Sequence, residues 1–246
     1  MSTSLRQIPR PAWAAIVVVL GAGLYTAAWF SAAAVLKGQA ATWIAAQQRA
    51  GYVIDHSEPT VSGFPAQAIV TYADWRMAAP ATSTAWAWRT PAIRVSAAPW
   101  APLRFTVDLA GDHQVTGLGA AQSIISAAKA LVRPALSTEG RISEIDVDIA
   151  GVTVSLPGHD TAVASIETAA LAVTRERTSD GEVWHVTADA ANWHAPLLED
   201  PSAFTPNVRS LRFTADLTGA LPSGTLPEAL RAWHESGGTL EVRELL

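Results

Sequence analysis

The chain has 246 residues, no cysteine, and 17 Lys and Arg against 22 Asp and Glu. Without cysteine it forms no disulfide and offers no thiol for catalysis or for binding zinc or iron–sulfur clusters. Excluding Arg6, Arg10 and Lys37 leaves 14 basic and 22 acidic residues, and this net charge of −8 disfavours a nucleic acid or an anionic surface as partner.

The chain opens with an uncharged apolar run at residues 12–36. A hydrocarbon core of about 30 Å takes about 20 residues of helix, so this run predicts a retained transmembrane anchor. The alternative is a cleaved signal peptide, whose apolar core is shorter, about 7 to 15 residues, and residues 31–34 offer a small-residue cleavage site. Arg6 and Arg10 precede the run, and short basic flanks tend to stay in the cytoplasm.

These features predict a single-pass inner-membrane protein with a cytoplasmic N-terminus and most of the chain in the periplasm. The predicted segments are a cytoplasmic tail at 1–11, a transmembrane anchor at 12–36, a helical stalk at 37–50 and a β-rich periplasmic domain at 51–246. Gly51 is expected to end the stalk helix, because glycine readily adopts the left-handed conformation found there.

Beyond residue 51 the apolar residues recur with a period of two. Residues 103–111 read LRFTVDLAG, residues 211–219 read LRFTADLTG, and residues 144–151 share the ending VDIAG with the first. This alternation predicts antiparallel strands with one apolar and one polar face, and the closing glycine of each motif is expected to end its strand in a turn. Further strands are predicted at 52–61, 66–77, 85–90, 93–97, 123–132, 163–175 and 183–190.

The predicted fold class is therefore mainly β with one N-terminal transmembrane helix: a curved antiparallel sheet with an apolar and a polar face, and few short helices. One such helix is expected at 226–235, with Pro227 at its start and Gly237 past its end, before a strand-like pattern at 239–246. The apolar face must be covered. We expect the sheet to curl onto itself, to form a sandwich, or to leave an apolar trough.

The motif Gly63-Phe64-Pro65 lies between two predicted strands. Its structural interpretation is a tight turn at Gly63, with Phe64 covering the apolar face and Pro65 opening the next strand. The alternative is a binding role for Phe64.

The motif VSGFP at 61–65 follows the predicted membrane helix. Further along the chain come Trp86, Trp88, Pro91 and the segment AWHESGGTLEV at 232–242. Together they resemble the alphaproteobacterial envelope family catalogued as domain of unknown function 2125, over residues 10–246. The resemblance implies a membrane-anchored, β-rich envelope protein of no known activity. That family's pattern runs on past the Gly-Gly strand, so the chain is either a short member or lacks its C-terminal end. At the level of the fold alone it is also similar to outer-membrane-biogenesis proteins with one membrane helix and a curved sheet.

No residue pattern points to a reaction. None of the six histidines pair at metal-ligand spacing, and the glycine loops that bind phosphate are absent. His159-Asp160 comes closest to a metal or acid–base pair, but Pro157-Gly158 before it is typical of a turn. We expect no catalytic, metal-binding or cofactor-binding residue, and therefore a protein that is not an enzyme.

Two hypotheses about function lead, and an enzyme is the third, for which a pocket containing His159 or His185 with two carboxylates would count. The first is a non-catalytic cell-envelope protein that binds lipid or another apolar ligand on its sheet face, which predicts an apolar trough open to solvent. The second is a protein-interaction module at a membrane complex, which predicts a closed core and an exposed aromatic patch. The expected partners are the inner membrane, a lipid and an envelope protein, with no nucleic acid. Candidate contact residues are Phe64, Trp75, Trp86, Trp88, Trp100, Phe105, Leu109 and Phe213.

Overall fold

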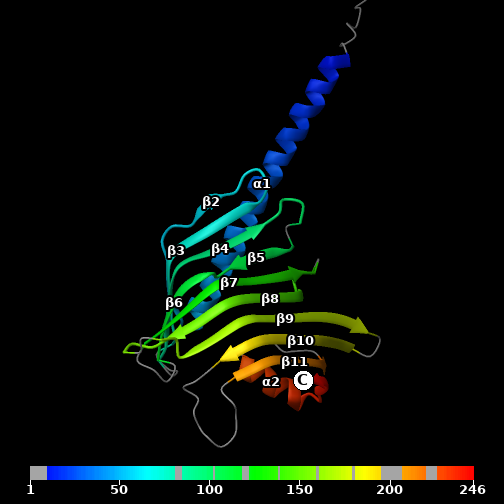
Figure 1. The fold of residues 1–246 in the computed structure, drawn as a ribbon. Helices are drawn as coiled ribbons and strands as arrows, with labels where there is room; N and C mark the ends of the chain where they lie inside the picture. The colour runs from blue at the N-terminus through cyan, green and yellow to red at the C-terminus, as the bar shows by residue number, and fades with distance from the viewer. Residues whose placement is uncertain are drawn as a thin grey trace, which may run out of the picture.

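One long helix and one antiparallel sheet make up most of the computed structural model (Figure 1). The structure describes residues 10–80, 85–101, 103–117, 122–137, 139–158, 161–178, 181–194, 207–219 and 226–246. The two helices are α1 (Arg10–Arg49) and α2 (Leu226–Glu235). The first six strands are β1 (Val53–Asp55), β2 (Thr60–Ser62), β3 (Ala68–Ala78), β4 (Ala87–Ala97), β5 (Phe105–Asp108) and β6 (Gly111–Thr116). The other six are β7 (Ser123–Leu136), β8 (Ile142–Ser155), β9 (Ala164–Thr178), β10 (Gly181–His194), β11 (Asn207–Thr218) and β12 (Thr239–Leu245).

Helix α1 is continuous for 40 residues and crosses the predicted boundary between anchor and stalk at residue 36. It ends where the sequence predicts. Gly51 adopts a φ of 94°, its N–H donates to the carbonyl of Gln48, and the N–H of Tyr52 donates to the carbonyl of Gln47. These two bonds satisfy carbonyl groups that the end of a helix leaves without partners.

All strand pairs of the sheet are antiparallel, in the order β1-β3-β4-β5-β7-β8-β9-β10-β11-β12. The short strand β2 pairs with β3, and β6 pairs with β4 and β7. Strands β2 and β3 lie nearest the N-terminal part of α1, and β11 lies at the opposite end of the sheet (Figure 1). The predicted fold class is confirmed.

The pairing register places one apolar residue of each main strand in a single row across the sheet. The row consists of Val70, Val95, Val107, Val132, Val147, Leu171, Ala188, Phe213 and Leu245. Because paired residues share a face, this row defines one apolar face of the sheet.

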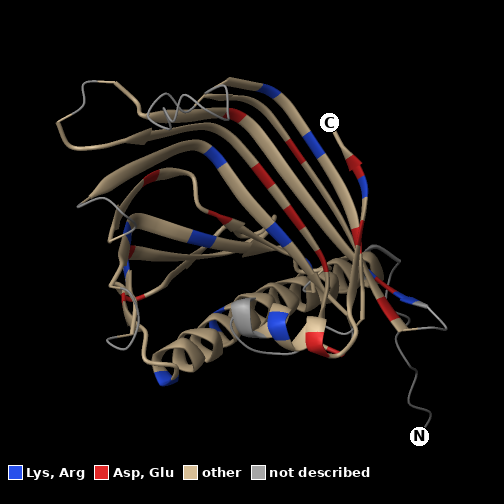
Figure 2. Ribbon diagram, turned by 90° about the horizontal axis from the view of Figure 1, so that it is seen from below, with Lys and Arg blue, Asp and Glu red and all other residues tan. Residues whose placement is uncertain are grey.

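The residues next to this row in each strand point to the opposite face of the sheet, and several of them are charged. Arg94 pairs with Asp108 there, at 3.5 Å between guanidinium and carboxylate, and Asp148 accepts from Lys129 and lies 3.6 Å from Arg133. The sheet curves over α1, and its charged residues lie in bands across the strands (Figure 2). The predicted division into an apolar and a polar face therefore holds across strands from β3 to β12.

A line of interrupted pairing crosses the sheet. Residues that fall at gaps in the strand registers and lie opposite one another are Asp74, Pro91, Ala128, Gly151, Glu167, Asn192 and Arg209. Asp74, Gly151 and Asn192 have φ values of 53°, 59° and 50°. Pro91, in β4, has no N–H to donate to a neighbouring strand. On the side away from β3, the partner of β4 is divided at this level into two strands, β5 and β6.

This line shifts the apolar alternation by one residue. The buried residues of β3 step by two from Val70 to Tyr72 and then by three to Trp75. Likewise β4 steps by three from Thr90 to Ile93. Because one residue is skipped in each strand of the pair, the register is kept and the following side chains return to the face covered by α1.

The closing glycines of the strand motifs behave differently from one another. Gly219 follows the end of β11, as predicted. The prediction for Gly111 and Gly151 is wrong, because Gly111 opens β6 and Gly151 lies inside β8. At both places the chain passes the interrupted line and continues in the same direction.

Other strand boundaries also differ from the sequence prediction. The strands predicted at 85–90 and 93–97 form the single strand β4, because Pro91 lies at the interrupted line and does not end the strand. The strand predicted at 52–61 is divided into β1 and β2, and β6 was not predicted. The pair His159-Asp160 lies outside the described residues.

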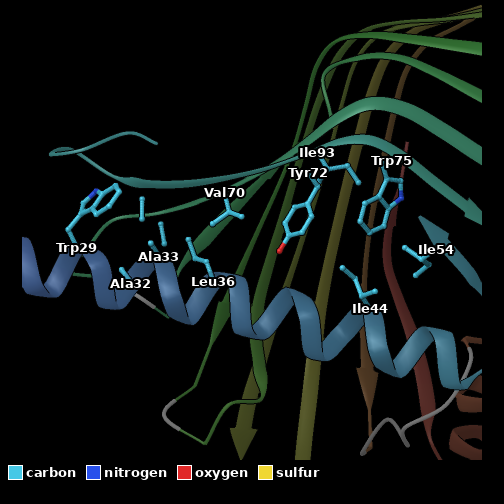
Figure 3. Packing of buried hydrophobic residues seen from close by; sticks show 12 residues of the cluster. Trp29, Ala32, Ala33, Leu36, Ile44, Ile54, Val70, Tyr72, Trp75 and Ile93 are labelled. Atoms are coloured by element: carbon cyan, nitrogen blue, oxygen red, sulfur yellow. The ribbon is translucent and has the colours of Figure 1, made fainter. Parts of the chain in front are cut away.

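The core lies between α1 and the first strands of the sheet. Trp29, Ala32, Ala33, Leu36 and Ile44 are buried against residues of β1, β3 and β4 (Figure 3). Their partners are Ile54, Ala68, Val70, Tyr72, Trp75, Ile93 and Ala97. The second half of α1 is thus part of the fold.

We predict that Gly151→Ala lowers the free energy of unfolding by about 1–3 kcal/mol, because an alanine is strained at positive φ. Its Cβ would also lie 2.9 Å from the Cβ of Ala128. Urea unfolding of the full chain in detergent, followed by tryptophan fluorescence, measures the loss. Adding Ala128→Gly as a matched variant should recover the part caused by the close contact. An unchanged unfolding midpoint for Gly151→Ala would contradict the account of this line.

Candidate functional site

The apolar face extends well beyond the strands that α1 covers. Helix α1 contacts β1, β3 and β4, and side chains of β5 pack against the edge of that core. From β7 to β11 the row residues Val132, Val147, Leu171, Ala188 and Phe213 are only half-buried. At the last strand, Leu245 is 66% exposed, and Leu240 and Val242 are exposed as well. Large exposed apolar patches of this kind mark binding surfaces in soluble domains.

Helix α2 lies beside the far end of the sheet. The indole N–H of Trp233 donates to the carbonyl of Thr218 at 3.0 Å, and the ring is buried. A Cβ at Gly238 would lie 2.3 Å from the Trp233 ring, so glycine allows this close approach. The contact fixes α2 next to the turn after β11 and anchors the start of β12.

The predicted aromatic candidates separate into core and surface groups. Trp75 is 4% exposed, with the rings of His56 and Trp43 stacked against it at centroid distances of 5.6 and 6.4 Å. Trp88 lies 6.4 Å from Trp75 and is half-buried. Phe105 and Leu109 pack against the same core. These residues therefore support α1 and form no surface patch.

The remaining candidates lie apart from that cluster. Trp86 packs beside Tyr52 at a centroid distance of 6.1 Å, and Trp100 is 72% exposed in the connection between β4 and β5. Phe213 lies on the apolar face of β11. Phe64 is 56% exposed next to Trp29, so the prediction that it covers the apolar face of the sheet is wrong, because its ring packs on α1 instead.

His113 is held in the core by both ring nitrogens. The indole N–H of Trp88 donates to Nδ1 at 3.2 Å, and Nε2 lies 2.6 Å from the carbonyl oxygen of Leu109. Because Nδ1 accepts and Nε2 donates, these partners select the neutral tautomer with its proton on Nε2. Neither nitrogen is available for proton transfer, so His113 acts as a structural side chain.

A polar cluster on β9 to β12 brings His185 to two carboxylates, whose identity the sequence did not predict. His185 lies between two carboxylates, with Nδ1 2.8 Å from Asp216 and Nε2 3.2 Å from Glu176. Arg243 donates to the second oxygen of Asp216, whose side chain is buried. The hydrogen bond to Asp216, followed by that to Glu176, raises the pKa of His185 above its usual value. Only the sheet register brings these residues together, since they are up to 67 positions apart.

The described residues include no group of three or more His, Asp or Glu side chains arranged to hold a metal ion. A depression of about 410 Å³ lies between Asp148, Asp189 and Arg212, which are residues of the polar face. Another, of about 480 Å³, lies at the end of β10 and β11 around Trp193 and His194. Neither is the apolar trough that the lipid hypothesis predicts; the apolar face is an open surface.

These features define a β-sheet protein whose single long apolar helix is packed into its own core. Within the described part of the chain, this helix alone is long and apolar enough to cross a membrane. The chain belongs to the bacterial family described as uncharacterized protein conserved in bacteria (DUF2125), whose model matches residues 29–245. No curated protein and no solved structure matches the chain.

We predict that His185 stabilises the fold most at low pH. A raised pKa means that the folded state binds the proton more tightly, so this stability is complete below the unfolded pKa of about 6.5 and is lost as pH rises through the folded value. His185→Gln should therefore lose more unfolding free energy at about pH 5.5 than at about pH 8.5. Urea titrations at both pH values measure the difference, with the exposed His234→Gln as control. An equal loss at both pH values would contradict the prediction.

Proposed function

We propose that the protein is a non-catalytic cell-envelope protein, anchored by α1 in the inner membrane, that binds the acyl chains of lipids on its apolar sheet face. The observation that carries the proposal is the continuous apolar row, which α1 covers over its first strands and leaves open from β7 to β12. Eight steps of about 4.8 Å between strands make this row about 38 Å long. Its first residue, Val70, packs on the helix that we propose crosses the membrane.

The exposure of α1 supports a membrane span. Nearly all side chains from Trp13 to Ala28 are exposed, although most are apolar. From Arg10 to Trp29 the helix has 20 residues and is about 30 Å long, which equals the thickness of a hydrocarbon core. Arg6 precedes this segment and Arg10 opens it, and such a basic flank supports a cytoplasmic N-terminus and a periplasmic sheet.

The charge distribution agrees with an acyl chain as ligand. The apolar row contains no charged residue, and the ion pairs Arg94–Asp108 and Arg212–Asp189 lie on the opposite face. An acyl chain has no hydrogen-bonding groups and gains about 25 cal/mol for each Å² of apolar surface that it removes from water. An open apolar face can therefore hold it without the convergent polar groups that a soluble small molecule requires.

A second function is favoured by the edge of the sheet. Strand β12 pairs with β11 on one side only within the described chain, and it exposes Leu240, Val242 and Leu245. An open strand edge is a template for a strand of another protein. In this alternative the protein is an interaction module at a membrane complex. The aromatic cluster around Trp75 takes no part in it, because that cluster is covered by α1.

We predict that a photocrosslinking amino acid at position 188 captures phospholipid, whereas the same group at position 187 does not. Ala188 belongs to the apolar row and Thr187 points to the other face of the same strand, so the pair is matched in depth and sequence. The full chain is used, expressed in cells fed with radioactive phosphate, because α1 is part of the core. Phe213→Asp, which places a carboxylate opposite Ala188, should remove most of the adduct.

Equal labelling at the two positions, or none at 188, would exclude the apolar face as a lipid site. Protein adducts at Leu240 in place of lipid adducts at 188 would favour the interaction module. Circular dichroism of each variant shows whether the sheet remains intact.

A further inference from the structure

The turn between β2 and β3 is fastened to α1 at two levels. The indole N–H of Trp29 donates to the carbonyl of Gln67 at 2.9 Å, and the hydroxyl of Tyr25 donates to the carbonyl of Pro65. Within the turn, Gly63 has a φ of 93°, and a Cβ there would lie 2.4 Å from the Gln67 carbonyl oxygen. The turn thus has a defined position along the helix.

Two exposed phenyl rings flank the buried indole at this level. Phe64 contacts Trp29 edge to face at a centroid distance of 5.5 Å, and Phe30 does so at 5.1 Å. Trp29 is almost fully buried, whereas Phe64 and Phe30 are both more than half exposed. The described part of the chain leaves these two adjacent rings exposed to water, and an apolar environment would stabilise them.

The packing of α1 fixes where such an environment lies. From Trp29 onward the helix carries residues buried against the sheet, so lipid can surround it only on the N-terminal side of this residue. The 20 residues from Arg10 to Trp29 then cross the hydrocarbon core, and Tyr25 lies about 6 Å inside its boundary. The carbonyl of Pro65 is hydrogen-bonded to Tyr25, so the turn reaches the same depth.

We propose that the Phe64 turn, residues 61–67, is a second membrane contact of the domain. Its phenyl ring inserts at the boundary between the headgroups and the acyl chains of the outer leaflet. The inference rests on the proposed membrane span of α1. The turn reads VSGFPAQ and carries no charge, and α1 carries none between Arg10 and Lys37, so insertion buries no ion. Any protein partner at Phe64 would also have to replace lipid around Tyr25 and Phe30.

A second contact gives the anchor an orientation. One helix allows the domain to rotate about its axis, whereas a helix and a turn attached at the same leaflet hold β2 and β3 at the membrane. The remaining strands then lead away from the bilayer (Figure 1). The apolar row consequently begins at the outer leaflet, where acyl chains are available.

The absence of native cysteine allows a direct test with single labelling sites. Phe64→Cys and, with the ring retained, Ala66→Cys in the full chain are labelled with an environment-sensitive fluorophore and placed in lipid nanodiscs. Val18→Cys in the free part of α1 reports the membrane span, and Ser210→Cys, exposed on the polar face of β11, is the control. Phosphatidylcholine spin-labelled near the headgroup end of its acyl chain is the quencher.

The expected result is blue-shifted emission and quenching at positions 64 and 66, and unquenched emission at 210. Quenching at 18 with emission at 64 and 66 like that at 210 would overturn the second contact and leave the membrane span intact. If position 18 is also unquenched, even by a lipid that carries its spin label deeper in the acyl chain, the membrane span is overturned and this inference with it.

Discussion

The packing of α1 against β3 and β4 is the contact on which the rest of the structure depends. The same helix is exposed and apolar over its first half and forms one side of the core over its second half. Val70 is fully buried only because the helix covers it, and Trp75 lies between Trp43 of the helix and His56. The sheet and its proposed anchor are therefore one folding unit, and residues 51–246 alone would leave the start of the apolar face uncovered.

The second constraint is that a long bent strand must keep its apolar residues on one side. A strand alternates its side chains strictly, so a bend that adds one residue would send the apolar side chains to the wrong face unless the sequence shifted with it. In β8 the pattern changes phase at Gly151, from Ile149 to Val152, opposite the interruptions in β7 and β9. Because every strand from β3 to β11 changes phase at the same level, the sheet bends as a whole and keeps one apolar face.

The described chain covers only part of the apolar face, and the proposed function depends on the part left open. A closed core would have satisfied the sequence equally well, with α1 and α2 on a smaller sheet. Here the sheet has too many strands for one helix, and the surplus is arranged as a row that leads from α1 to the edge strand β12. The polar face carries ion pairs that keep that side solvated, and the described residues include no group of His, Asp and Glu side chains that could hold a metal ion.

The sequence by itself determined the long apolar helix and its end at Gly51, the antiparallel strands, and the division into an apolar and a polar face, because these follow from the spacing of residues close in the chain. It also indicated the family, which the match over residues 29–245 confirms. The tertiary structure decided what covers the face, that β6 and β8 continue past Gly111 and Gly151, that His185 meets Asp216 and Arg243, and that Phe64 packs beside Trp29. These depend on residues far apart in sequence, whose meeting is fixed by strand register and helix packing rather than by any local pattern.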